Sequence, residues 1–206
     1  MKKWDYILFL IIDKQNIFDR IEKMTKKILF IATWLFSLGM QATSPTSQEI
    51  LKQLVQNAHG GMEIHNINGQ TSYFGYVGTG YQFYFYKQKA YVRPDIDFKW
   101  GEYRYQSGYH VETASFALPV TVGYHIFQQN DIRMTIFGGG RYEQIIHSAN
   151  NNYAYGINNA QAGLTAGASI RLLNKFGINV GYYHGLTSLF KDGSGRISSF
   201  NFSINF

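Results

Sequence analysis

The chain of 206 residues contains no cysteine. Disulfide bonds, thiol catalysis and cysteine-ligated metals are therefore excluded. Proline occurs only three times, and charged residues make up 16% of the chain, below the usual quarter. The mean hydropathy is nevertheless only −0.21, and this pairing of few charges with modest hydropathy argues against a helical membrane protein. It is typical of a β-barrel in a bilayer, whose apolar outer face is averaged against a polar interior.

The chain also lacks a basic stripe. Its net charge is +6, but residues 43–206 carry 12 Lys and Arg side chains against 9 Asp and Glu, which leaves +3. These charges do not gather in one segment. Nucleic acid is therefore not expected as a partner.

No apolar run reaches the length of a membrane-spanning helix. The run at 28–40 covers thirteen residues, well short of the roughly twenty that a bilayer requires. It follows two lysines and precedes Ala42, so a secretory signal peptide is predicted at residues 24–42. Residues 1–23 are expected to be a mis-assigned start or a dispensable extension, with translation starting at Met24.

A short helix or linker is predicted at residues 43–60. Thr46 followed by Glu49 resembles a capping box, and the apolar residues after them share one helical face. The alternative is a plug inside the barrel, which the filled interior of small barrels disfavours. The barrel itself is predicted over residues 61–206.

Apolar and polar side chains alternate from residue 61 onward. The last segment is the clearest, since Phe200, Phe202, Ile204 and Phe206 alternate with small polar residues, a period that predicts a strand with one apolar face. A soluble sheet would expose such an edge to aggregation, whereas a closed barrel in lipid has no edge. Eight strands are predicted: Met62–Ile67, Tyr73–Tyr86, Ala90–Tyr103, Thr113–Phe127, Asp131–His147, Asn159–Leu172, Lys175–Thr187 and Arg196–Phe206.

The connections between these segments alternate in length. Those after the second, fourth and sixth strands are short, while those at 106–111, 148–157 and 188–196 are longer and polar. Short turns on one rim and long loops on the other are typical of outer-membrane barrels. The sequence therefore predicts an all-β fold, an eight-stranded antiparallel up-and-down transmembrane β-barrel. We expect it in the bacterial outer membrane, surrounded by outer-membrane lipid, with both termini in the periplasm.

Charged side chains within the strands alternate with the apolar ones. Placing Lys or Arg on the lipid face near the midplane costs about 2–4 kcal/mol, so these charges are expected to face the lumen. The predicted lumen charge network comprises Arg93, Asp95, Asp97, Lys99, Arg133, Arg141, Glu143 and Arg171. The charges of such a network neutralise one another except for an excess of two positive charges. A small anion or water would complete the network. The alternative is an ion path, although eight strands leave little aqueous bore.

Four short motifs lie in the predicted barrel. They are Tyr91-Val92-Arg93-Pro94-Asp95-Ile96, Ser115-Phe116-Ala117-Leu118-Pro119-Val120, Gly138-Gly139-Gly140 and Tyr182-Tyr183-His184-Gly185-Leu186-Thr187. They resemble strands of the PorT-like family of small outer-membrane β-barrels, found in Bacteroidota. The resemblance covers about residues 61–206 and implies insertion by the barrel-assembly machinery. The assembly signal would be the terminal strand, with Phe200, Phe202, Ile204 and Phe206.

Catalysis and metal binding have little support in the sequence. The residue types of a hydrolase are present as His125, His147, His184, Glu143 and Ser188. A catalytic set must lie within hydrogen-bond reach, yet His184 is predicted on the outer face and His125 near the periplasmic rim. His110, His147 and His184 lack the spacing of metal ligands. No catalytic residue, cofactor or metal is therefore expected.

The predicted function is that of a non-enzymatic integral outer-membrane barrel with a structural or surface-interaction role. Its loops would bind an extracellular ligand. The loop at 150–156, rich in asparagine and with two tyrosines, suits such recognition because these side chains make adaptable contacts. Two alternatives stay open, a lipid-modifying outer-membrane enzyme and a narrow solute pore.

Overall fold

The computed structural model describes residues 46–105, 108–149, 156–173 and 176–205. The predicted signal peptide at 24–42 and the extension at 1–23 lie outside these residues, as do Phe206 and most of the loop at 150–156. Within the described part, the helix that is present is too short and too polar to cross a membrane.

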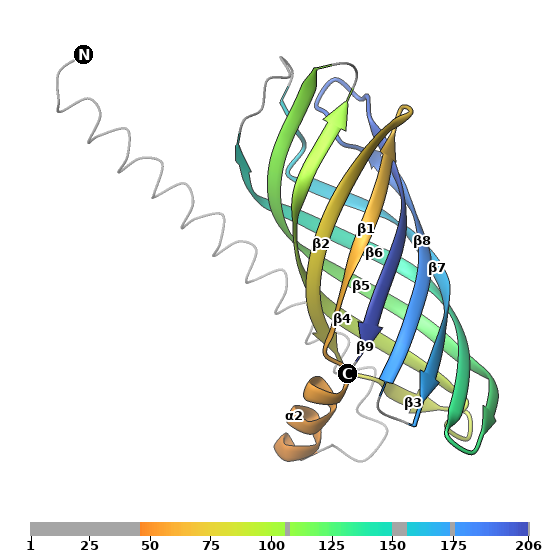
Figure 1. Ribbon diagram of the computed structural model, residues 1–206. Coiled ribbons are helices and arrows are strands. Elements are labelled where there is room, and N and C mark those ends of the chain that lie inside the picture. The colour runs from red at the N-terminus through yellow and green to blue at the C-terminus, as the bar shows by residue number, and fades with distance from the viewer. Residues whose placement is uncertain (1–45, 106–107, 150–155, 174–175, 206) are drawn as a thin grey trace. The chain divides into compact units, whose positions relative to one another are not determined.

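Antiparallel strands form most of the described chain (Figure 1). Their bounds are β1 His59–Ile67, β2 Gln70–Gly80, β3 Phe83–Phe85, β4 Ala90–Tyr105, β5 Tyr109–Gln129, β6 Ile132–Ala149, β7 Ala160–Leu172, β8 Phe176–Ser188 and β9 Arg196–Asn205. Each long strand pairs with the next along the chain, and β1 pairs with β9. Because β2 and β3 both pair with β4, they act as one interrupted strand. The sheet thus closes with eight strands around, and the predicted up-and-down barrel is confirmed.

We call the end of the barrel where β9 ends the lower end. The turns β3–β4, β5–β6 and β7–β8 lie there, and the connections β4–β5, β6–β7 and β8–β9 lie at the upper end (Figure 1).

Alternation along the strands separates an apolar outer face from a polar lumen. In β9, Phe200, Phe202 and Ile204 are 56%, 48% and 41% exposed, whereas Ser199 and Ser203 on the opposite face are buried. The same period of two runs through the other long strands. A closed sheet leaves no backbone edge for lipid to solvate, so this outer face suits a bilayer.

Two upper connections differ from the sequence prediction. The segment at 106–111 was predicted as a polar loop, but its residues 109–111 belong to β5, which starts at Tyr109, and β4 runs to Tyr105 on the other side. Polar residues such as Glu102 and Glu112 are cross-strand neighbours in this extension. Polar residues do not by themselves end a strand. Here the backbone hydrogen bonds between β4 and β5 continue beyond the apolar band on the outside of the barrel.

The second difference concerns the β8–β9 connection, which was also predicted as a polar loop. Leu189 and Phe190 in this connection are only 0% and 2% exposed. The Leu189 N–H donates to the carbonyl of Gly195 at 2.8 Å, and the Phe190 ring lies 4.5 Å from that of Tyr105. The connection therefore folds into the lumen, because burying two large apolar side chains outweighs leaving the loop in solvent.

These two side chains complete an apolar cluster that fills the upper lumen. We call it the upper plug. Its members are Ile67, Phe74, Tyr103, Tyr105, Val111, Ile145, Ile157, Tyr183, Leu189, Phe190 and Ile197.

A single helix, α2 (Ser47–Gln56), precedes the barrel in the described chain. The Glu49 N–H donates to the Thr46 hydroxyl at 3.3 Å, and the Thr46 N–H donates to the Glu49 carboxylate at 2.8 Å, so the predicted capping box is confirmed. The Thr79 hydroxyl donates to the carbonyl of Leu54 and ties the helix to β2. None of the helix side chains is buried, which is not the behaviour of a plug.

Candidate functional site

All eight residues of the predicted lumen network are placed on the inward face, at two levels. Lys99, Arg141 and Glu143 lie below the upper plug, at mid-height in the lumen. The others line its lower part: Arg93, Asp95, Asp97, Arg133 and Arg171.

The middle level is a neutral group that we call the central ion-pair cluster. Lys99 Nζ lies 2.8 Å from a carboxylate oxygen of both Glu63 and Glu143. Arg141 reaches Glu63 at 2.7 Å and Glu143 at 3.2 Å, and its guanidinium stacks over the Tyr183 ring at 3.7 Å. All four charged side chains are at most 5% exposed. Two cations therefore face two carboxylates, as buried charges require.

Further hydrogen bonds satisfy the carboxylates of this cluster. The Ser115 hydroxyl donates to Glu143 at 2.7 Å, and a His65 ring nitrogen lies 2.7 Å from Glu63. Buried charges that keep such partners avoid most of the cost of leaving water.

Sequence reasoning missed Glu63, His65 and His59, all on β1. The segment was predicted as a strand without assignment of its faces, because its six predicted residues gave a weak alternation. Apolar Met62 and Ile64 alternate with polar Glu63 and His65, and this alternation indicates which residues face the lumen. The outward exposure of Met62 agrees with it. With Glu63 included, the inward charges are five positive and four negative, so the predicted excess of two becomes one.

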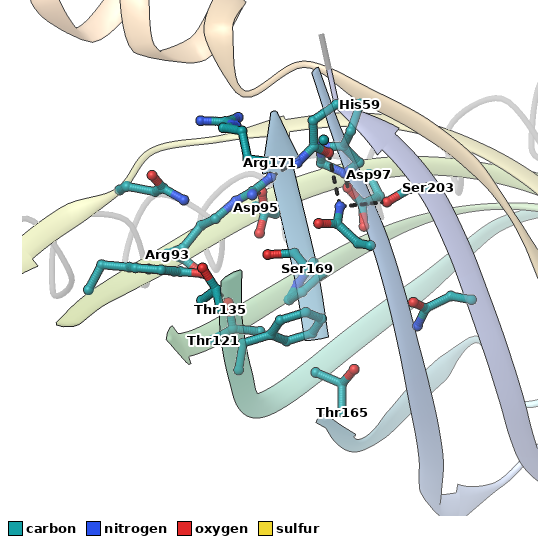
Figure 2. Close-up of a pocket in the computed structure, with 18 of the residues that line it drawn as sticks. His59, Arg93, Asp95, Asp97, Thr121, Thr135, Thr165, Ser169, Arg171 and Ser203 are labelled. Atoms are coloured by element: carbon teal, nitrogen blue, oxygen red, sulfur yellow. Dashed lines mark hydrogen bonds and ion pairs between the residues drawn. The ribbon is translucent and has the colours of Figure 1, made fainter. Parts of the chain in front are cut away.

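The lower level contains a second set of ion pairs (Figure 2). Arg93 Nε lies 2.7 Å from the Asp95 carboxylate, and His59 Nε2 lies 2.9 Å from Asp97. The other ring nitrogen of His59 lies 2.9 Å from the carbonyl oxygen of Asn57. Nε2 faces an acceptor, the Asp97 carboxylate, whereas Nδ1 also lies 3.2 Å from a guanidinium nitrogen of Arg93, which is a donor.

Arg133 and Arg171 lie near these ion pairs but are not members of them. They are direct cross-strand neighbours on β6 and β7. Among the residues that the structure describes, neither forms an ion pair with a carboxylate. Arg171 donates to the backbone carbonyl of Gln56 at 3.3 Å, and Arg133 Nε is buried without a partner.

His125 is a third polar group of the lower lumen that is incompletely satisfied. Its Nδ1 lies 2.8 Å from the Thr135 hydroxyl, and its ring lies 5.4 Å from that of Tyr91 and 6.0 Å from that of Tyr84. The residue is only 6% exposed, yet its Nε2 has no partner.

These groups surround a cavity of about 110 Å³ in the lower lumen (Figure 2). Its wall is strongly polar. Besides the charged residues it includes Thr121, Thr135, Ser169, Asn179 and Ser203.

The other candidate residues are dispersed. His184 lies on the outer face, as predicted, with its Nδ1 3.4 Å from the Ser198 hydroxyl on β9. His125 faces the lower lumen and is far along the strand from His110. Among the described residues, no group of three or more His, Asp or Glu side chains is arranged to hold a metal ion.

The chain matches a family of known proteins. The family model for the outer membrane protein beta-barrel domain matches residues 36–191. No curated protein matches the chain.

The chain is similar to several solved structures. The outer membrane enzyme PagL aligns with a TM-score of 0.52 and 14% identity, over 71% of this chain and 97% of PagL. Neisserial surface protein A aligns at 0.45 and 9%, over 72% and 92% of the two chains. Ail, the attachment invasion locus protein of Yersinia pestis, aligns at 0.40 and 10%, over 72% and 95%.

Proposed function

Since the chain belongs to the outer membrane protein β-barrel domain family and resides in the bacterial outer membrane, we propose that it is a closed, non-enzymatic barrel with a structural or surface-interaction role. Outer-membrane barrels have their short turns in the periplasm. The lower end is accordingly the periplasmic end, and the upper end faces the exterior.

The observation that carries this proposal is the filled lumen. A solute pore needs a continuous path of water, whereas Leu189 and Phe190 close the upper lumen. Beneath them the central ion-pair cluster is neutral, and its charged side chains are almost completely buried. A passing ion would have to displace both layers, so a role at the surface fits better than transport.

The upper end offers a surface for such a role. A bilayer is crossed by about 9–11 strand residues, whereas β5 contains 21 and β6 contains 18. The surplus extends the β4–β5 hairpin beyond the apolar band, with Arg104 and Tyr109 exposed near its tip. We propose that an extracellular ligand contacts this hairpin, together with the loop at 150–156 that the sequence composition singles out.

Planar-bilayer conductance tests the closed lumen. We expect the purified protein to be silent, and Arg93→Ala and Asp97→Ala to be silent as well, because the upper plug remains. The double variant Leu189→Ala/Phe190→Ala opens the plug and should give rare, small steps. Discrete steps from the unaltered protein would refute the proposal.

One observation favours an enzyme as the second candidate, the pair of His184 and Ser198 on the outer face. PagL, which shares the fold, is an outer membrane enzyme. A hydrolytic histidine needs an orienting acid, but the cross-strand neighbour of His184 on β7 is Leu164. Lipid mass spectra of cells with and without Ser198→Ala test this candidate. We expect identical spectra, and a lipid that shortens only with the intact serine would establish the enzyme.

We further propose that the chain is a PorT-like protein of the Bacteroidota type, inserted by the barrel-assembly machinery. The four motifs support this assignment. The first motif has a structural reason here. A Cβ on Gly123 would clash with the Tyr91 ring, so the bulky Tyr91 needs this glycine opposite it. Deleting Phe206 should lower the amount of folded barrel in the outer membrane if the terminal strand, with Phe200, Phe202 and Ile204, is the assembly signal.

A further inference from the structure

The lower lumen carries positive charge that its own residues do not balance. The central ion-pair cluster is neutral by itself, so the excess falls entirely on the lower level. The cavity is lined by Arg93, Arg133 and Arg171 with Asp95 and Asp97. Arg141 and Glu63 also line it, but they pair with each other in the central ion-pair cluster. The excess is one charge if His59 is neutral and two if it is protonated.

The excess is concentrated on Arg133 and Arg171. Like charges directly opposite each other on neighbouring strands are destabilising, and these two are such neighbours. They cannot relieve the repulsion by turning toward lipid headgroups outside, because their strand neighbours Met134 and Ile170 occupy the outer face. Both guanidinium groups therefore remain in the lumen and line the cavity.

Two buried nitrogen atoms without a hydrogen-bond partner face the same cavity. His125 lines it, is more than nine-tenths buried and has no partner at Nε2. Arg133 Nε is likewise buried without a partner. Buried polar atoms normally have hydrogen-bond partners. Two buried nitrogen atoms without a partner, next to two adjacent arginines, indicate that a negatively charged acceptor is missing.

We propose that this cavity binds a phosphate-type oxyanion, held by Arg133 and Arg171 with His125 as a further donor. Planar guanidinium groups match the oxygen geometry of phosphate better than that of a spherical ion. The cavity of about 110 Å³ is several times what one water molecule needs. Hydroxyl groups of Thr135 and Ser169 on its wall supply additional donors. The site lies at the periplasmic end and does not depend on whether the upper lumen conducts.

The phosphate group has two possible sources, a soluble periplasmic phosphate compound or the headgroup of an inner-leaflet lipid. Both present the same oxygens to the arginines. The two are separated by the probe that is offered to the protein.

The test is calorimetric titration of the full folded chain in dodecyl maltoside, a detergent without phosphate. One arm uses inorganic phosphate at constant ionic strength, and the other uses short-chain phosphatidylglycerol in phosphate-free buffer. Arg133→Gln should weaken binding at least tenfold, because it removes a charge-assisted contact. The matched control is Arg196→Gln, which removes an exposed arginine at the opposite end, where β9 starts, and should bind like the unaltered protein.

Folding of each variant is checked by its heat-modifiable mobility in gels. Arg133→Gln removes a like-charge contact, so it should fold at least as well as the unaltered chain. Arg171→Gln is a second variant at the same site, and its binding of the two probes is measured in the same way. Binding of inorganic phosphate identifies a soluble ligand, and binding of the lipid alone identifies a headgroup, provided that each depends on Arg133. The proposal is overturned if neither probe saturates, or if Arg133→Gln and Arg196→Gln bind equally.

Discussion

Replacing Glu63 by glutamine would remove one negative charge from the central ion-pair cluster with almost no change of volume. The carboxylate contacts Arg141 at 2.7 Å, Lys99 at 2.8 Å and His65 at 2.7 Å. Without it, Lys99 and Arg141 share Glu143 as their only carboxylate partner, which leaves one uncompensated buried cation. Breaking a buried ion pair in this way costs about 3–5 kcal/mol. We expect a loss of that size in the free energy of unfolding.

The assay is reversible urea unfolding of the barrel in lipid vesicles, followed by tryptophan fluorescence. Glu102→Gln is the control, since Glu102 forms an exposed pair with Arg104 and such pairs contribute at most about 1 kcal/mol. The double variant Glu63→Gln/Lys99→Met should recover part of the loss, because the cluster is then neutral again. A loss below about 1 kcal/mol for Glu63→Gln would refute the argument that these charges depend on one another.

Three further predictions concern other parts of the chain. Thr46→Ala should destabilise α2 by about 1 kcal/mol, seen as faster hydrogen exchange in the helix with the barrel unchanged. Gly123→Ala should cost about 1–3 kcal/mol in urea unfolding, because the new methyl group meets the Tyr91 ring; unaltered stability would contradict this packing. Ala166→Arg, outward at mid-strand, should cost about 2–4 kcal/mol, whereas Leu173→Arg at the lower turn should cost far less.

The strands and their faces were predictable from sequence because a barrel in lipid imposes a strict physical constraint. An arginine such as Arg133 or Arg141 has only one tolerable face, so a single charge sets the register of a whole strand. β1 was harder, since its inward carboxylate Glu63 lies in a short segment that follows two glycines. The alternation of Met62 and Ile64 with Glu63 and His65 covers only four residues, and the pairing of β1 with β2 and β9 on either side fixes its faces.

The subdivision of the lumen charges was not predictable from sequence. Parity places Lys99 and Asp97 on the same inward face, but it does not say which cations and carboxylates meet across the lumen. That depends on the stagger of the strands, which joins Glu63 of β1 to Arg141 of β6, residues 78 positions apart in sequence. For the same reason the inward fold of Leu189 and Phe190 was missed. It depends on an apolar space that only the closed barrel provides.

The pairing of β1 with β9 has a consequence for the order in which the barrel forms. Neighbouring strands elsewhere follow each other along the chain, whereas His59 must find Asn205 at the opposite end of the barrel sequence. The chain entropy lost in such a contact is large, so this pairing should form last. Glu63 is carried on β1 and reaches Lys99 and Arg141 only when the sheet has curled around. Until that moment the interior holds unmatched positive charge, and its neutralisation favours the closed sheet over every open intermediate.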